Sequence, residues 1–570
     1  MRFTSIRTLT FAIAGIGSLV ALTSNLATLA AHDEDRFRPG HLVLSRTVYA
    51  GDATTVTVGQ TLPPGCVSGK VAVPLIAGGT TNVTVACSVA VADGSYPTVF
   101  NNNKADGSFG VTSPIFLDQM TPDGAVVNVL AIPPTDIVTS FSSKSELALN
   151  LADDGRSITL VGYVGGASFP TAANQLDVSN SNTPGVVDPT NPVASQYYRA
   201  VAEVDAEGRL QITDGNAYSG NNGRAAVKAD GLYYLAGNDN NGGLSKTQLT
   251  TTHVGVDLVN STGVELLFPG LAPPLPPNID KIGDFEVTQV GFTTPDKPGK
   301  DNNFRGLTAF NQTLYVTKGS GGNGINTVYQ VGSAGMLPTP SNAPGGNLLN
   351  VPITILPGFP RTLASGAAPD GTLGHPIAFP FGIWFADATT LYVTDEGDGT
   401  LVSPAVNGNV ADAATLATAG LQKWVFNATT QQWQLAYTLQ DGLRLGVPYS
   451  VPSGPHGEVY PSNLNPAADG LRNLTGRVNR DGTVTLWAIT STVSSNGDQG
   501  ADPNQLVAIT DRLRATTPHG AHFRTLRTAR YGEVFRGVSF TPGTEKTACD
   551  DRRREDRECD QARDDDHDRR

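Results

Sequence analysis

Oxygen-bearing and cationic side chains recur at the starts of the strands that the sequence predicts. Carboxylate and amide oxygens are the ligands that calcium takes, about six to eight at a time, and forked guanidinium groups hold anionic or hydroxylated ligands. The candidate metal ligands are Glu146, Asn222, Asn303 and Asn473, and the candidate ligand-binding cations are Arg224, Arg305 and Arg536. Because tight turns also favour Asn, and surface arginines reach into solvent, ordinary turn chemistry is the favoured alternative.

Three further carboxylates, Asp395, Glu396 and Asp398, lie within the segment TDEGDG. Carboxylates this close repel one another unless a cation or solvent screens them, so they are additional candidate ligands for calcium. A similar polar segment, GNDNNGG at 237–243, follows an earlier strand pair. This equivalence favours a solvent-exposed turn for both segments, with calcium binding as the alternative.

No motif identifies a catalytic residue. The phosphate-binding GxxxxGK[ST] loop, the GxSxG nucleophile elbow and the HExxH zinc helix are absent from the sequence. The chain has 8 histidines, of which His519 and His522 lie close together in HGAH, and this spacing makes no site by itself. Catalytic residues are therefore unknown from the sequence.

One pair of strands recurs along the chain. Each copy has an alternating apolar strand, a polar turn, a second apolar strand and an exit rich in Gly, Asp and Asn, which is typical of a β-hairpin. The copies lie at residues 146–162, 223–237, 305–319, 382–397 and 475–490, and a second, less regular hairpin lies at 198–212, 254–268 and 421–439. Because two hairpins make one four-stranded blade, the repetition predicts an all-β protein, a β-propeller.

The two ends of the chain supply strands for one further blade. Residues 536–542 (RGVSFTP) have the pattern of a first strand without a second, and residues 41–51 (HLVLSRTVYAG) that of a second strand without a first. The hairpin predicted at 115–132 would complete this blade. Sharing one blade between the N- and C-terminal strands closes the ring and removes exposed sheet edges. We therefore expect a single propeller of about six blades, with residues 270–300 as the place for a seventh.

Three segments differ in composition and mark the domain boundaries. Residues 1–31 combine a basic start, a short apolar run and small residues before a cleavage point, and predict a signal peptide. The propeller then spans 32–544 with an insertion at about 52–114. Residues 545–570 are almost wholly charged and predict a disordered tail. We expect a secreted protein, extracellular or periplasmic, without a membrane span.

The spacing of the cysteines agrees with export. The four cysteines form two local pairs, Cys66 with Cys87 and Cys549 with Cys559, and no CxxC arrangement occurs. Thiol-redox and four-thiolate zinc sites are therefore disfavoured. In an oxidising compartment we expect disulfide bonding, which for the first pair stabilises by about 3 kcal/mol through loop-closure entropy.

The net charge of −13 and the pI of 5.1 limit the partners. An acidic surface repels phosphate backbones and anionic lipid headgroups, so we expect no nucleic acid and no membrane surface as a partner. Cationic ligands and metal ions remain candidate partners. The favoured explanation of the negative charge, however, is that it only keeps a secreted protein soluble. We expect a monomer that binds an unknown small molecule, glycan or protein.

The segments LTAFNQTLYVTKG and IWFADATTLYVTDEGDG resemble the blade cores of propellers of the NHL and SMP-30 type. The resemblance implies a six-bladed ring in which an inner strand precedes an LYVTD-like second strand. Members of this group include calcium-dependent lactonases and esterases as well as binding proteins, and their metal ligands are Glu, Asn and Asp at the channel mouth. Glu146, Asn222, Asn303 and Asn473 would match those ligands. Secreted phytases are also six-bladed and rich in calcium.

A propeller hosts receptors, scaffolds and hydrolases alike, so its fold does not define its function. The sequence favours a ligand- or protein-binding module. The alternative is a calcium-dependent hydrolase, either a lactonase or esterase or a phytase-like phosphoesterase, acting at the channel mouth. In that alternative calcium polarises a carbonyl or phosphoryl oxygen and activates a bound water, and Glu146 is the first ligand we would assign.

Overall fold

The computed structural model describes most of the chain between residues 36 and 544. The described residues are 36–52, 54–62, 66–74, 80–85, 87–90, 92, 94, 110–141, 147–165, 178, 181–184, 196–238, 256–260, 281–284, 303–319, 324–361, 363, 378–399, 416–493 and 502–544. The predicted signal peptide, the predicted tail, Cys549 and Cys559 lie outside them. Within these ranges no helix is long and apolar enough to cross a membrane. The helical elements among the described residues are short 3-10 turns: η2 (Pro344–Gly346), η3 (Leu348–Asn350) and η5 (Ser462–Leu464).

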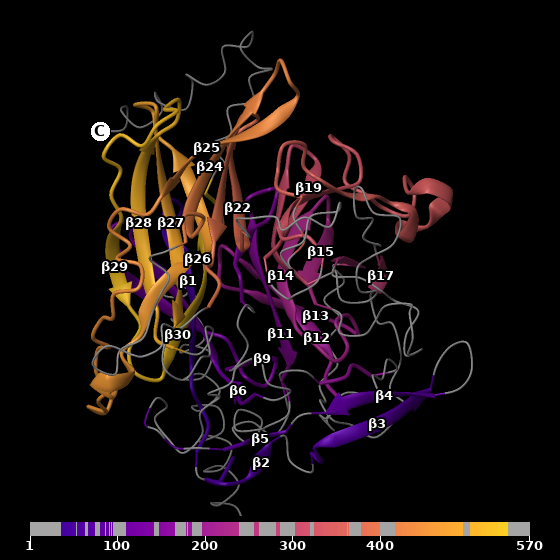
Figure 1. Ribbon diagram of the computed structural model, residues 1–570, viewed down its shortest axis with the longest axis vertical. Coiled ribbons are helices and arrows are strands. Elements are labelled where there is room, and N and C mark those ends of the chain that lie inside the picture. The colour runs from indigo at the N-terminus through magenta and orange to yellow at the C-terminus, as the bar shows by residue number, and fades with distance from the viewer. Residues whose placement is uncertain are drawn as a thin grey trace, which may run out of the picture.

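Four sheets repeat one pattern along the chain, and together with their neighbours they form a β-propeller (Figure 1). In each, four antiparallel strands pair in sequence order, as in a propeller blade. The strands are β14 (Gly223–Ala229), β15 (Leu232–Gly237), β16 (Val256–Asn260) and β17 (Lys281–Asp284); β18 (Phe304–Phe310), β19 (Thr313–Lys318), β20 (Thr327–Val331) and β21 (Ile353–Ile355); β22 (Pro380–Asp387), β23 (Thr390–Asp395), β24 (Gly420–Asn427) and β25 (Gln432–Leu439); and β26 (Ala467–Val478), β27 (Thr483–Val493), β28 (Gln505–Arg512) and β29 (Arg524–Thr528).

These strands confirm most of the predicted hairpins and correct two details. β26 begins at Ala467 rather than at residue 475, so its hairpin with β27 is longer than expected. β17 lies inside residues 270–300, the place expected for a seventh blade, but it pairs with β16 as the outer strand of an existing blade. β16 is the first strand of the outer hairpin predicted at 254–268, and residues 261–268 lie outside the described residues.

The two ends of the chain meet in one four-stranded blade, as the sequence predicts. Its order is β30 (Glu533–Phe540), β1 (Leu42–Val48), β7 (Ile115–Met120) and β8 (Val126–Ala131). β1 pairs with β30 antiparallel, with Leu44 opposite Val538. Figure 1 shows the two strands side by side, the first in indigo and the second in yellow. β30, the last strand of the described residues, is therefore the inner strand of this blade, and β1 lies next to it.

The remaining sheet has six strands and is less regular. Its order is β13 (Leu210–Gly215), β12 (Arg199–Asp205), β11 (Ser157–Val164), β9 (Ile137–Ser140) and β6 (Thr112–Ser113), and β10 (Asn150–Leu151) pairs with β11. β10 contacts β14 and β30, the inner strands of the sheets on either side. We expected about six blades. The described residues form five four-stranded blades and this six-stranded sheet.

The long connection between β1 and β7 forms two small hairpins. β2 (Thr61–Leu62) pairs with β5 (Ser88–Val89), and β3 (Gly69–Pro74) pairs with β4 (Thr80–Val85) at the lower right of Figure 1. The predicted Cys66–Cys87 disulfide is present, with the two Cα atoms 6.0 Å apart. A disulfide indicates an oxidising compartment.

Threonines of the LYVT segments tie neighbouring blades together around the channel. Thr317 on β19 accepts the Gly306 N–H at 2.8 Å and donates to the Phe381 carbonyl of the next blade at 2.5 Å. Thr394 on β23 accepts the Gly382 N–H at 2.6 Å and donates to the Arg472 carbonyl. A Cβ on Gly306 would lie 1.9 Å from the Phe381 carbonyl oxygen, so glycine lets the strands approach this closely. The repeat thereby positions Phe381 and Arg472 at the channel.

Candidate functional site

The two ends of the central channel differ in chemistry. Buried charged side chains gather where the inner strands begin, and we call this end the entry mouth; its central residues are Arg305, Phe381, Glu396 and Arg472. The later residues of β10, β14, β18, β22, β26 and β30 surround a cavity of about 330 Å³, which we call the exit cavity. Either end offers groups that could contact a ligand.

At the entry mouth one carboxylate receives two guanidinium groups from different blades. Glu396 follows β23, and its Oε2 lies 3.1 Å from Nε of Arg472 on β26. Its Oε1 lies 3.6 Å from Nη2 of Arg305 on β18. The Phe381 ring lies between them, 5.9 Å from the guanidinium carbon of Arg305 and 5.6 Å from that of Arg472. Three successive blades are therefore joined by one buried ionic cluster.

The predicted ligand-binding arginines are all buried at the starts of inner strands. Arg224, Arg305 and Arg536 expose only 1%, 3% and 4% of their surface. Nη2 of Arg536 donates to the Phe141 carbonyl oxygen at 2.5 Å. The expectation that such arginines reach into solvent is wrong, because the neighbouring blades enclose them. Arg472, which the sequence analysis did not select, lies in the same setting because β26 starts earlier than predicted.

The acidic segment after β23 is not the solvent-exposed turn that we favoured. Asp395 and Glu396 are buried, whereas Asp398 is exposed. Asp395 accepts the backbone N–H groups of Phe379 at 2.8 Å and Gly397 at 3.0 Å. Burial raises its pKa to about 6. The segment folds inward because these backbone donors and the Arg–Glu cluster satisfy its charges.

A further buried carboxyl, Asp469 on β26, completes the acidic side of the entry mouth. Its Oδ2 accepts the Gly399 N–H at 2.8 Å. Burial, together with the nearby carboxylates of Asp398, Glu396 and Asp395, raises the pKa of Asp469 to about 8. Asp469 is therefore protonated at neutral pH.

The raised pKa values predict that stability falls as pH rises. The folded protein keeps protons on Asp395 and Asp469 that the unfolded chain, with a carboxyl pKa of about 3.9, releases. Their contribution to the free energy of unfolding is complete below the unfolded pKa and is lost as pH rises through 6 and then 8. For Asp469 we expect a loss of about 2 kcal/mol between pH 6 and pH 8, measured by urea unfolding in EDTA.

The variant Asp469→Asn serves as the control for this pH dependence. An uncharged amide has no proton to release, so its unfolding free energy should change little between pH 6 and pH 8. A wild-type protein whose stability is constant or rises over this range would contradict the assignment.

The predicted calcium ligands do not form a recognisable group in the described part of the chain. Glu146 lies outside the described residues, and within them no three His, Cys, Asp or Glu side chains come together as a metal site. Asn222 is buried and Asn303 half-buried at the starts of β14 and β18. The amide oxygen of Asn473 accepts the Val538 N–H at 2.6 Å, which ties β26 to β30. Calcium binding remains a prediction.

The exit cavity has an aromatic and aliphatic wall that is partly open to solvent. Trp384 and Phe310 are half-buried, and Phe310 stacks on Phe385 with ring centroids 4.6 Å apart. A Cβ on Gly476 would lie 2.9 Å from ring atoms of Trp384, so the missing side chain leaves room for the indole. The other tryptophans, Trp424, Trp433 and Trp487, are buried within the blades. Among the four, Trp384 lines the cavity.

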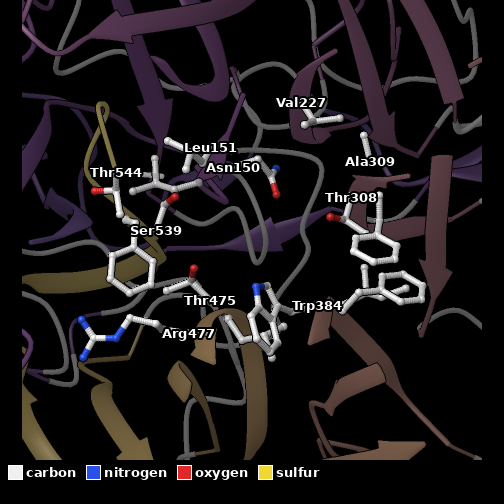
Figure 2. A pocket seen from close by; sticks show the side chains of 17 residues that line it. Asn150, Leu151, Val227, Thr308, Ala309, Trp384, Thr475, Arg477, Ser539 and Thr544 are labelled. Atoms are coloured by element: carbon white, nitrogen blue, oxygen red, sulfur yellow. The ribbon is translucent and has the colours of Figure 1, made fainter. Parts of the chain in front are cut away.

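Polar groups face this cavity from four inner strands. Figure 2 shows the Asn150 amide, the Thr308 and Thr475 hydroxyls and the indole nitrogen of Trp384 directed toward the space between them. Asn150 donates through Nδ2 to the Ala226 carbonyl oxygen at 2.9 Å. Within the described chain, the hydroxyls of Thr308 and Thr475 and the indole N–H of Trp384 make no hydrogen bond. No sequence motif marks these residues, because each is an ordinary strand residue.

Comparisons with known proteins identify no family. No family model matches the chain, and no curated protein matches it. Among solved structures, a candidate 6-phosphogluconolactonase from Bacteroides uniformis is 10% identical over 74% of this chain and 81% of its own, with a TM-score of 0.29. The hemagglutinin-neuraminidase ectodomain of parainfluenza virus 5 is 11% identical over 92% and 99%, with a TM-score of 0.30. An ulvan lyase of polysaccharide lyase family 25 is 12% identical over 78% and 94%, with a TM-score of 0.26.

Scores this low carry no argument about activity. The resemblance of the blade cores to NHL and SMP-30 propellers accordingly remains a prediction, and function has to be inferred from the two ends of the channel.

Proposed function

We propose that this protein is a secreted ligand-binding propeller that holds a small molecule in the exit cavity. One observation carries the proposal: a half-buried aromatic wall at Trp384 faces threonine hydroxyls that, like the indole N–H, make no hydrogen bond within the described chain. Small-molecule sites are concave, mostly apolar and equipped with a few convergent polar groups, with volumes of about 300 to 1,000 Å³. The exit cavity, at about 330 Å³, suits a small ligand.

The ring around this site has six sectors in our interpretation. β10 takes the inner position in the six-stranded sheet, and it contributes Asn150 to the cavity. The other five inner strands contribute Val227, Thr308, Ile383, Thr475 and Ser539. The cavity is thus built from all six sheets at once, which supports counting the larger sheet as a sixth blade.

Export of the protein rests on two independent features. The sequence of residues 1–31 has the pattern of a signal peptide, and the Cys66–Cys87 disulfide requires an oxidising environment to persist. The ligand is therefore one that reaches an extracellular or periplasmic protein.

Filling the exit cavity should abolish ligand binding without unfolding the protein. Thr308→Phe places a ring in the cavity from a half-buried strand position, so the added side chain enters open space rather than a packed core and should destabilise the protein little. We expect compounds that raise the melting temperature of the wild type in a small-molecule library to lose this effect in the variant. The matched control is Thr525→Phe, on the exposed face of the outer strand β29, which should keep every hit.

The proposal fails if the library yields hits that Thr308→Phe leaves unchanged. Such compounds would bind elsewhere, and the entry mouth would become the first place to search.

A second candidate, a hydrolase acting at the entry mouth, is favoured by one specific observation. Asp469, with a pKa raised to about 8, lies near Glu396, which two arginines hold. Neighbouring carboxyls in contrasting environments are the arrangement that acid–base catalysis uses. Calcium bound by Glu146 and the mouth asparagines would supply the Lewis acid, as the NHL and SMP-30 resemblance implies.

This candidate predicts turnover in a screen of esters, lactones and phosphate esters with added calcium, lost on chelation and in Asp469→Asn. Turnover that survives both would exclude the assignment of these groups.

A further inference from the structure

We propose that the exit cavity selects a sugar acid, a hydroxylated ring that carries a carboxylate. This inference rests on the proposed function, since it names the class of ligand for the same cavity. Three features of the cavity support it: the charge of its described lining, the surroundings of the Arg477 guanidinium, and the neutral side chains that can form hydrogen bonds.

The charge of the lining differs from that of the protein as a whole. The chain has a net charge of −13, yet the described residues that line the cavity include no Asp or Glu. Their single charged side chain is Arg477 on β26. A cationic ligand would find no counter-charge there, whereas an anionic group would find a guanidinium in a region without carboxylates.

Arg477 lies beside two aromatic rings and has no acidic partner among the described residues. Its guanidinium carbon lies 5.8 Å from the Trp487 ring and 6.0 Å from the Phe540 ring. No carboxylate among the described residues forms an ion pair with it. A guanidinium beside aromatic rings keeps its N–H donors available, and a planar carboxylate matches their fork.

The neutral groups favour a hydroxylated ring over an aromatic one. The amide oxygen of Asn150 points into the cavity in Figure 2, opposite the indole N–H of Trp384. The Thr308 and Thr475 hydroxyls add two groups that both donate and accept. An aromatic acid would bury these groups without partners, whereas sugar hydroxyls would pair with them. Trp384 then supplies the apolar wall for the face of the ring.

The test compares matched charged and neutral sugars by titration calorimetry on the intact protein. The probes are D-glucuronate and D-galacturonate, with D-glucose and D-galactose as their neutral counterparts and benzoate as an aromatic acid. We expect the better uronate to bind at least about tenfold more tightly than its neutral counterpart. Benzoate should bind more weakly than that uronate, because it leaves the hydroxyls without partners.

Two variants separate the contributions of charge and hydrogen bonding. Arg477→Gln should remove the tenfold preference for the uronate and leave the neutral sugar unchanged, while Arg480→Gln, in the exposed turn that follows, should change neither. Thr475→Val should weaken both members of the pair. Equal affinity for uronates and neutral sugars, a preference that survives in Arg477→Gln, or benzoate binding as tightly as the uronates would overturn the proposal.

The experiments distinguish a wrong ligand class from a wrong binding site. If library hits are lost in Thr308→Phe but no uronate binds, the exit cavity binds ligands and the sugar-acid assignment is wrong. If Thr308→Phe affects no hit, the proposed function itself fails, and this inference fails with it.

Discussion

Asp511→Asn is expected to lower the free energy of unfolding by about 3–5 kcal/mol, because it leaves a buried ammonium group without its counter-charge. Asp511 on β28 and Lys423 on β24 have side chains that expose only 1% and 0% of their surface, and Nζ of Lys423 lies 3.1 Å from Oδ2. The hydroxyls of Tyr392 and Tyr437 donate to the same carboxylate at 2.7 and 2.8 Å. The carboxylate therefore joins two adjacent blades through three donors.

Urea unfolding followed by far-UV circular dichroism measures this loss as a lower midpoint at unchanged slope. The double variant Lys423→Met with Asp511→Leu provides the control, since it removes both charges and should recover much of the lost stability. A single Asp511→Asn variant with wild-type stability would show that the pair is not buried as described.

Ending the chain after Gly532 is expected to abolish cooperative folding. The truncation removes β30, which pairs with β1 and supplies the buried side chains of Phe535, Val538 and Phe540. Burial of an apolar side chain of this size contributes about 1.5–3 kcal/mol, so the three together account for about 4.5–9 kcal/mol before lost strand pairing is counted. It also exposes the edge of β1, which invites aggregation.

A thermal melt followed by circular dichroism tests this prediction. Ending the chain after Thr544 is the matched control, because it removes only the charged segment predicted to be a disordered tail and should leave the transition unchanged. A sharp transition that persists after removal of β30 would contradict closure of the ring by the terminal strands.

Local sequence patterns predict the hairpins well and the irregular strands poorly. β14 with β15 and β22 with β23 are joined by short turns, so alternation and turn residues lie within one window. β17 follows β16 after residues 261–280, and only sheet pairing assigns it to that blade. β26 has register shifts between Ala468 and Gly470 and between Leu471 and Leu474, which interrupt the alternation that would have marked its start.

The candidate site depends on tertiary contacts that sequence reasoning does not reach. Glu396 was expected in an exposed turn, yet arginines from the blades on either side enclose it. Trp384 and the buried Trp424 both lie in strands, but Trp384 is on the innermost strand of its blade, where it faces the glycine at 476 on the neighbouring inner strand. Arg477 indicates the charge of the ligand only because the described lining contains no Asp or Glu, which the sequence alone does not show.

The central claim, that the exit cavity is the ligand site, is tested most directly by fluorine NMR of protein labelled with 5-fluorotryptophan. The chain has 4 tryptophans, and Trp384→Phe assigns the resonance of the one that lines the cavity. On addition of uronates or library hits, we expect the Trp384 resonance to shift and those of Trp424 and Trp433 to stay in place. Ligands that bind without moving the Trp384 resonance would contradict the claim.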